Sequence, residues 1–191
     1  IERIDGYAFG NCYNLNSITI SSSVEDLSEL AFRECSNLSE IIVDENNETY
    51  SSIDGVLFNK AQTGLVLYPE GKTDETYTVP DGVTTIGLGA FENNHHLKGV
   101  TLPDSVTELG QAAFASCYVL KSIELPESIT YISIAAFQSC SCLESVTIPS
   151  SVTSIYLNAF EGCPSLSTVI FRGTVEQWEA IEIDDGNEVL K

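Results

Sequence analysis

The chain has 191 residues, 43% of them hydrophobic, and its 8 Lys and Arg against 28 Asp and Glu give a formal net charge of −20. This length and apolar content predict a folded protein and exclude a highly charged, disordered polymer. The acidic charge excludes nucleic acid and anionic membrane surfaces as partners, because binding to phosphates depends on Lys and Arg. Because the sequence contains neither a run of 18 apolar residues nor a basic start followed by an apolar segment, we expect no membrane insertion and no signal peptide in this piece.

An internal repeat of 23 residues runs along the sequence. Its clearest mark is a phenylalanine that always follows an alanine, and its Leu and β-branched positions keep the same spacing. The phenylalanines are Phe9, Phe32, Phe91, Phe114, Phe137 and Phe160. Each unit offers too few apolar positions to fold alone, so neighbouring units must stack on one another around a continuous core.

The regular repeats occupy residues 1–43 and 80–171. Each of them contains a short alternating run such as "LESVTI" (143–148), which is bounded by Pro149, and this predicts one short strand per repeat. Together the strands should form one parallel β-ladder. The "AFxxC" stretch is too short for a full helix and should be a helical turn on the opposite, convex side.

Residues 44–79 form a divergent repeat of 36 residues. Its runs "GVLF" (55–58) and "LVLY" (65–68) are joined by "NKAQTG", which predicts a β-hairpin, and "YTV" (77–79) should rejoin the ladder. Such an insert either decorates a binding face or has a structural role.

The last segment, residues 172–191, is predicted to be a cap. Thr174 followed by Gln177 is a capping box, which indicates a short helix over about 175–181. Trp178 and Ile181 on this helix should cover the open end of the last repeat. The N-terminus begins midway through a repeat without such a cover, so we expect this single solenoid domain (1–191) to be a fragment of a longer protein.

The pattern "LPxSVTxIGxxAFxxCxxLxxVxL" resembles the BspA-like, or Treponema-type, leucine-rich repeat family over nearly the whole chain. The resemblance implies a right-handed leucine-rich-repeat solenoid. It also implies a secreted or cell-surface protein of a host-associated bacterium, with a role in adhesion in several relatives. It does not imply a ligand, because members differ widely in their partners.

The residues give no sign of catalysis, of a cofactor or of a metal site. Nucleophile elbows, Gly-rich phosphate loops and HExxH motifs are all missing. His95 and His96 fall in one turn and are expected to be solvated. Five cysteines share one repeat position and are expected to be reduced, buried thiols, since residues stacked at strand spacing point the same way instead of toward each other; they are Cys12, Cys35, Cys117, Cys140 and Cys163. Cys142 lies outside this column.

Two surfaces are candidates for binding. The first is the outward column of the ladder, predicted from strand alternation to comprise Thr19, Ile42, Thr78, Thr101, Glu124, Thr147 and Ile170. Its small side chains lack the aromatic anchors of tight interfaces, so it is also consistent with a plain half-exposed sheet. The second is an aromatic and apolar cluster formed by Tyr131 and Tyr156 from consecutive repeats, with Leu88, Ile134 and Leu157 at one equivalent position nearby. A loop that covered this cluster would make it part of the core.

These observations favour a bacterial cell-surface or secreted binding module over an enzyme. Its partner would be a host or bacterial surface protein or a glycan, and the module itself is expected to be a monomer. The alternative is a passive spacer that presents other domains. The two hypotheses differ in one respect, because only a recognition module requires a contiguous outward patch that does not tolerate substitution.

Overall fold

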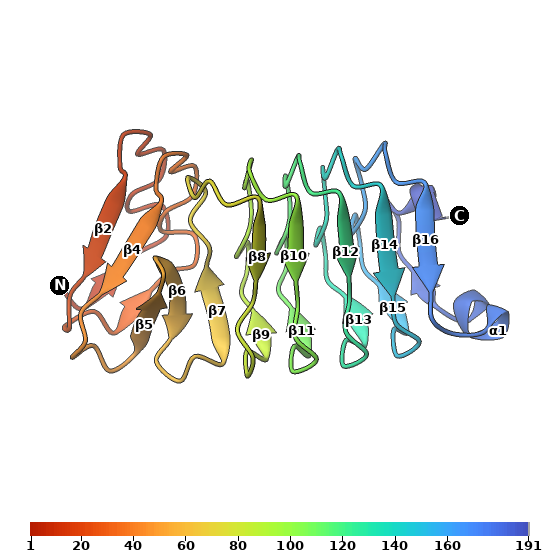
Figure 1. Ribbon diagram of the computed structural model, residues 1–191, viewed down its shortest axis with the longest axis horizontal. Helices are drawn as coiled ribbons and strands as arrows, with labels where there is room; N and C mark the ends of the chain where they lie inside the picture. The colour runs from red at the N-terminus through yellow and green to blue at the C-terminus, as the bar shows by residue number, and fades with distance from the viewer. Residues whose placement is uncertain (191) are drawn as a thin grey trace.

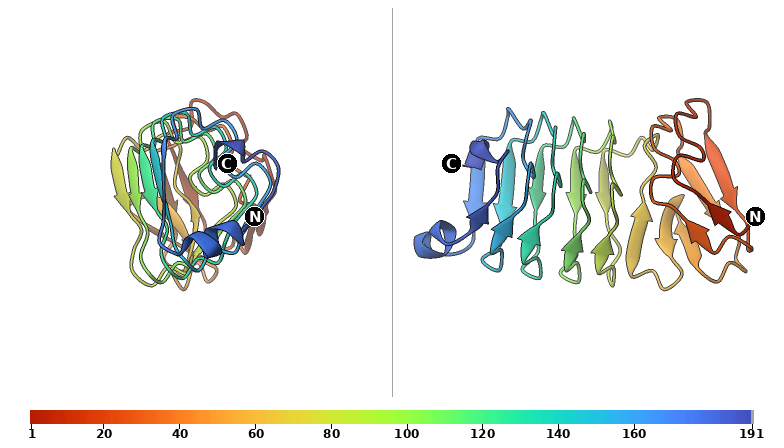
Figure 2. Two further views of the ribbon diagram at one scale, coloured as in Figure 1. Left: turned by 90° about the vertical axis from the view of Figure 1, so that its right-hand side faces the viewer. Right: turned by 180° about the vertical axis from the view of Figure 1, so that it is seen from behind.

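The computed structural model describes residues 1–190, and it shows an elongated solenoid with the two chain ends at opposite ends of one long axis (Figure 1). Viewed from the end, successive coils lie over one another (Figure 2, left). The predicted repeat solenoid is therefore confirmed. Three walls surround the core: a main ladder, a second ladder and a convex wall of turns.

The main ladder is the predicted parallel one. It consists of β2 (Ser17–Ile20), β4 (Glu40–Val43), β8 (Thr76–Thr78), β10 (Gly99–Thr101), β12 (Ser122–Glu124), β14 (Ser145–Ile148) and β16 (Thr168–Phe171). Residues 23 apart pair in register, as in Val146 with Ile123 and with Val169, and alternation turns these apolar side chains inward. The ladder is interrupted: β2 pairs only with β4, and β8 to β16 form a separate five-stranded sheet. The sequence did not predict this break.

A second ladder runs along an adjacent wall, whereas the sequence analysis expected one ladder only. Its parallel strands have two residues each: β1 (Arg3–Ile4), β3 (Asp26–Leu27), β9 (Thr85–Ile86), β11 (Glu108–Leu109), β13 (Tyr131–Ile132), β15 (Ser154–Ile155) and β17 (Glu182–Ile183). Like the main ladder it is interrupted, because β3 does not pair with β9 and β11 does not pair with β13. Threonine hydroxyls just before these strands strengthen the wall, since Thr107 and Thr153 each donate to the backbone carbonyl of the residue 23 positions earlier. Two residues are too few to show alternation in sequence, which is why this ladder was not predicted.

The convex wall contains consecutive tight turns in place of the expected helical turns. Ala112 and Ser116 have positive φ angles of 55° and 58°, which a right-handed helix does not allow. The backbone N–H groups of this wall therefore alternate between a partner in their own turn and one in the next repeat. The N–H of Ala115 donates to the carbonyl of Ala112 at 2.9 Å, and that of Phe114 donates to the carbonyl of Ala136 at 2.8 Å.

The repeating phenylalanines stack inside the solenoid in two runs of rings, Phe9 with Phe32 and Phe91 through Phe160. Phe114 lies 4.8 Å from Phe91 and 5.4 Å from Phe137 between ring centroids, with nearly parallel planes. Tyr68 takes the corresponding place in the divergent repeat, 5.3 Å from Phe91. The core is nevertheless divided into a small N-terminal cluster and a large one that extends from the insert to Leu190.

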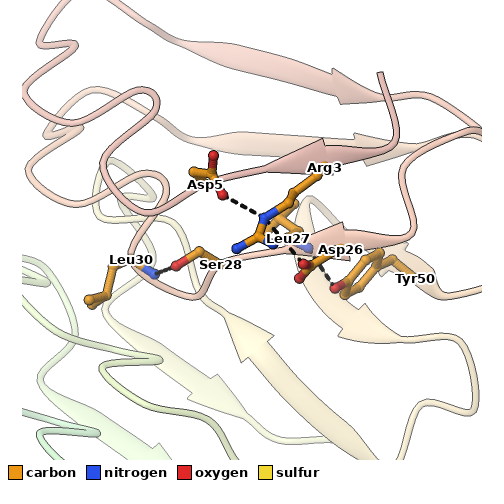
Figure 3. A network of polar contacts seen from close by, with 7 residues as sticks. All are labelled: Arg3, Asp5, Asp26, Leu27, Ser28, Leu30 and Tyr50. Carbon is orange, nitrogen blue, oxygen red and sulfur yellow. Dashed lines mark hydrogen bonds and ion pairs between the residues drawn. The ribbon is translucent and has the colours of Figure 1, made fainter.

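The divergent repeat separates these two clusters. Its predicted hairpin is confirmed as β6 (Val56–Asn59) antiparallel to β7 (Gly64–Leu67), and an additional strand, β5 (Tyr50–Ile53), extends it to a three-stranded meander. β7 also pairs in parallel with β9, and β8 rejoins the main ladder as predicted. The Tyr50 hydroxyl accepts the N–H of Leu27 at 3.0 Å, which links the insert to β3 (Figure 3).

The C-terminal segment forms the predicted helix α1 (Val175–Glu179), with the capping box of Thr174 and Gln177 in place. The helix itself buries no residue, and Trp178 contacts Phe171 while remaining partly exposed. Trp178 nevertheless packs against the core as predicted, and Ile181 and Leu190, the latter in the short 3-10 helix η1 (Glu188–Leu190), close it. At the end of the main ladder a hollow of about 380 Å³ stays open between Val169, Phe171 and Trp178.

Candidate binding surface

The outward column of the main ladder is largely as the sequence predicted. Glu124, Thr147 and Ile170 are neighbours in register, and Thr101 pairs with Thr78. The column is not continuous, because the ladder is broken between Ile42 and Thr78. Arg172 reaches across this face and pairs with Glu124 at 2.6 Å. A polar hollow of about 290 Å³ lies there, but no aromatic side chain lines it.

The second predicted surface brings two tyrosine rings together. Tyr131 opens β13 and points outward because Ile132 beside it is buried, and Tyr156 follows β15 in the next repeat. Their ring centroids lie 5.6 Å apart with planes tilted by 48°. The position of Tyr156 is held by Gly87, Gly110 and Ser133 in preceding repeats, so only small residues lie beside it on that side.

Two aliphatic side chains adjoin the tyrosines. Ile134 and Leu157 occupy one position in consecutive repeats, where the N–H of Ala135 donates to the carbonyl of Leu157, and they are 40% and 43% exposed. Tyr156 is 41% exposed. We call Tyr131, Ile134, Tyr156 and Leu157 the tyrosine patch. No loop covers it within residues 1–190, so the core alternative does not apply to it.

Leu88 is not part of this patch. It has the equivalent repeat position, but the exposed Gln111 separates it from Ile134 along the column. Leu88 is only partly exposed and lines a small cavity with Glu29.

The surroundings of the tyrosine patch are acidic. Burial raises the pKa of Tyr131, and the charge of Glu108 and a hydrogen bond to Glu108 raise it further. On the other side, Glu182, Asp184 and Asp185 are exposed in the final turn of the solenoid. The corresponding four-residue segments of this wall contain no Lys or Arg: 85–88, 108–111, 131–134, 154–157 and 182–185.

One aromatic pair was not predicted from the sequence. His95 and Tyr118 are both exposed, and their rings stack with centroids 5.4 Å apart and planes 8° from parallel. Tyr118 also lines a shallow hollow of about 510 Å³ on the convex side. The signal was present, because the two residues are 23 positions apart and therefore share one repeat position.

A group of carboxylates marks the joint between the two core clusters. Glu29, Glu70 and Glu92 line a cavity of about 20 Å³ together with Arg33, which pairs with Glu92 at 2.5 Å. Glu70 is buried, and its carboxylate accepts the N–H of Glu34 at 2.8 Å. Burial raises the pKa of Glu70 to about 7; the hydrogen bond from Glu34 opposes this shift, and the charge of Glu92 adds to it. Burial also raises the pKa of Glu29 and of Glu92.

The cysteines of the column link neighbouring repeats through hydrogen bonds of their thiols. All six thiols are free, and in four of them the sulfur donates to the carbonyl of the phenylalanine 26 residues earlier, as in Cys140 to Phe114 at 3.1 Å. Burial raises the pKa of Cys117 to about 12 and that of Cys163 to about 11. Asn94 holds the column position differently, because its side-chain oxygen accepts the N–H groups of His96 and Leu97.

Cys12, at the N-terminal end, is only partly buried, unlike the other members of the column. We expect thiol reactivity to separate Cys142 from the four buried members. The thiolate is the reactive form, so buried thiols with raised pKa values should react slowly with a thiol reagent in the native protein, whereas the exposed Cys142 should react fast. Cys142→Ser should remove the fast phase, and Cys163→Ser should leave it in place. Several cysteines reacting as fast as Cys142 would show that the column is open to solvent.

Within the residues that the structure describes, no group of three or more His, Cys, Asp or Glu side chains is arranged to hold a metal ion. The same residues contain no helix long and apolar enough to cross a membrane. The arrangement offers an exposed aromatic surface instead of a convergent set of reactive groups.

Known proteins provide an independent comparison. The model of the BspA type leucine rich repeat region matches residues 1–65 and 70–181 in six copies. No curated protein matches the sequence.

Solved structures match the fold closely. A leucine rich cell surface protein from Faecalibacterium prausnitzii is 36% identical with a TM-score of 0.71, and the match covers 90% of this chain and 52% of that protein. The pneumococcal vaccine antigen PcpA is 32% identical with a TM-score of 0.80, covering 84% and 40%. A leucine-rich repeat protein from Eubacterium ventriosum is 27% identical with a TM-score of 0.71, covering 81% and 48%. The chain thus spans about half the length of these proteins or less, and it belongs to the BspA type leucine rich repeat family.

Proposed function

We propose that this chain is a protein-binding module displayed on a bacterial surface or secreted, and that the tyrosine patch is its contact surface. The observation that carries the proposal is a pair of contacting tyrosine rings, Tyr131 partly exposed and Tyr156 exposed, with the exposed Ile134 and Leu157 in the same two repeats, on a protein whose other large apolar residues are mostly buried. Exposed apolar patches of this kind mark interaction sites, and tyrosine is enriched among the residues that dominate binding energy.

The family supports a surface location for the module. One of the similar structures is described as a cell surface protein and another as a vaccine antigen. Adhesion to a host protein is the role that fits a recognition patch on such a module. The Ser and Thr residues on the outer face of the main ladder would then have a structural role and no binding role, since Thr suits a half-exposed strand.

The proposal is tested by binding of the protein to an array of host matrix proteins and glycans. We expect saturable binding to a protein, with at least about a tenfold loss of affinity in a Tyr131→Ser, Tyr156→Ser double variant. A Tyr13→Ser, Tyr118→Ser variant removes two exposed tyrosines elsewhere and should bind normally.

Three outcomes would contradict the proposal. Failure to bind any partner would favour a passive spacer. Equal losses in both double variants would show that the tyrosine patch is not the contact surface. Binding only to glycans through this patch would show that the partner is a carbohydrate and not a protein.

A further inference from the structure

The tyrosine patch lies in a row with exposed carboxylates at both ends. Along the second ladder Tyr131 pairs with Ser154, and Ser154 pairs with Glu182. Glu108 precedes Tyr131 by one repeat, is exposed, and its charge contributes to the raised pKa of Tyr131. At about 4.8 Å per paired strand, Glu182 lies about 10 Å along the row from Tyr131.

Tyr156 lies beside this row next to Asp184. The N–H of Tyr156 donates to the carbonyl of Ile132, and that of Asp184 donates to the carbonyl of Ile155, each at 2.9 Å, so the two residues hold the same position in successive coils. The two tyrosine rings are thus flanked by Glu108 on one side and by Glu182 and Asp184 on the other.

These carboxylates have no cationic partner within residues 1–190. The ion pairs there involve Arg3, Arg33, Lys72, Lys98 and Arg172, and none of them reaches Glu108, Glu182 or Asp184. On a protein with a net charge of −20, this wall therefore presents two tyrosine rings beside carboxylates that pair with no Lys or Arg of residues 1–190.

We propose that the tyrosine patch binds an extended, Arg- or Lys-rich segment of a partner protein, with cationic side chains held over Tyr131 and Tyr156 and between the flanking carboxylates. This inference rests on the proposed function and specifies the chemistry of the partner. Cations are attracted to the faces of aromatic rings within about 6 Å, and a guanidinium also stacks flat on them.

The spacing of the rings fits an extended segment. Alternate side chains of a β-strand lie on one face about 6.6 Å apart, close to the 5.6 Å between the two ring centroids. Ile134 and Leu157 beside the rings offer apolar surface to the aliphatic stems of Lys or Arg. A neutral sugar would also stack on a tyrosine, but it would gain nothing from the carboxylates on either side.

The probe is a labelled decapeptide with Arg at alternate positions and Thr between them, compared with a version that has Gln in place of Arg. Binding is measured by fluorescence anisotropy at about 0.05 M and 0.3 M salt. We expect saturable binding of the Arg peptide, weaker at high salt, and no binding of the Gln peptide.

Two pairs of variants separate the site from the general acidity of the protein. Glu182→Gln, Asp184→Asn should weaken binding about tenfold, whereas Glu127→Gln, Glu144→Gln, which removes the same charge from exposed positions elsewhere, should weaken it less than twofold. Tyr131→Ser, Tyr156→Ser should abolish binding, and Tyr131→Phe, Tyr156→Phe should retain most of it, because the ring face and not the hydroxyl attracts the cation.

Equal losses in the two charge variants would overturn the inference, as would equal binding of the Arg and Gln peptides. A protein partner whose binding needs the tyrosines but ignores salt and the Glu182, Asp184 changes would also overturn it while leaving the proposed function intact. If no protein needs the tyrosines, both proposals fail together.

Discussion

Replacing Phe114 by alanine is expected to lower the free energy of unfolding by about 3 to 5 kcal/mol. The ring is fully buried and stacked between Phe91 and Phe137. Its removal would leave a cavity that the two flanking rings cannot fill without breaking the register of the ladders on either side. The loss would therefore include lost burial and the cost of the cavity.

Urea unfolding followed by circular dichroism measures this effect. Phe9→Ala is a matched control, because Phe9 holds the same repeat position at the N-terminal end, is only half-buried and stacks on Phe32 alone. It should cost clearly less. Since a repeat stack can unfold in parts, hydrogen exchange should accompany the measurement and show the loss of protection centred on the repeats around Phe114. A loss below about 1 kcal/mol for Phe114→Ala would contradict a core built on the ring column.

The stability of the protein is expected to fall between about pH 4.5 and pH 7, and Glu70 should account for much of the change. Its pKa is about 7 in the folded protein, above the ordinary value of 4.5, because burial disfavours the carboxylate. A group with a raised pKa contributes stability that is fully present below about pH 4.5 and is lost as the pH rises through about 7. The expected contribution is about 3 kcal/mol.

Glu70→Gln removes this titration and keeps an oxygen to accept the N–H of Glu34. The unfolding free energy of this variant should vary less with pH than that of the unsubstituted protein. Glu127→Gln removes an exposed carboxylate on another wall and should leave the pH dependence nearly unchanged. If both variants show the same curve as the unsubstituted protein, the joint between the two cores does not respond to pH, and the remaining slope comes from Glu29, Glu92 or the net charge.

The sequence determined the fold through its period. A spacing of 23 residues fixes which side chains share a position, so the Phe column, the cysteine column, the parallel pairing and the pairing of Glu124 with Thr147 all followed from counting. The capping box of Thr174 and the hairpin at 56–67 followed from local rules of helix ends and turns.

Only the tertiary structure showed the second ladder, the positive-φ turns and the break in the main ladder. The second ladder depends on two-residue strands whose pairing is set by neighbouring coils, and the positive φ of Ala112 is stabilised by hydrogen bonds to the next repeat, so neither has a local signal. The main ladder is broken where the insert lies between β4 and β8, and Glu70 of the insert is buried near this break. The repeat spacing also placed Tyr131 near Tyr156. The contact of their rings, their exposure and the carboxylates on both sides depend on how the last coil closes, and the repeat spacing does not specify this.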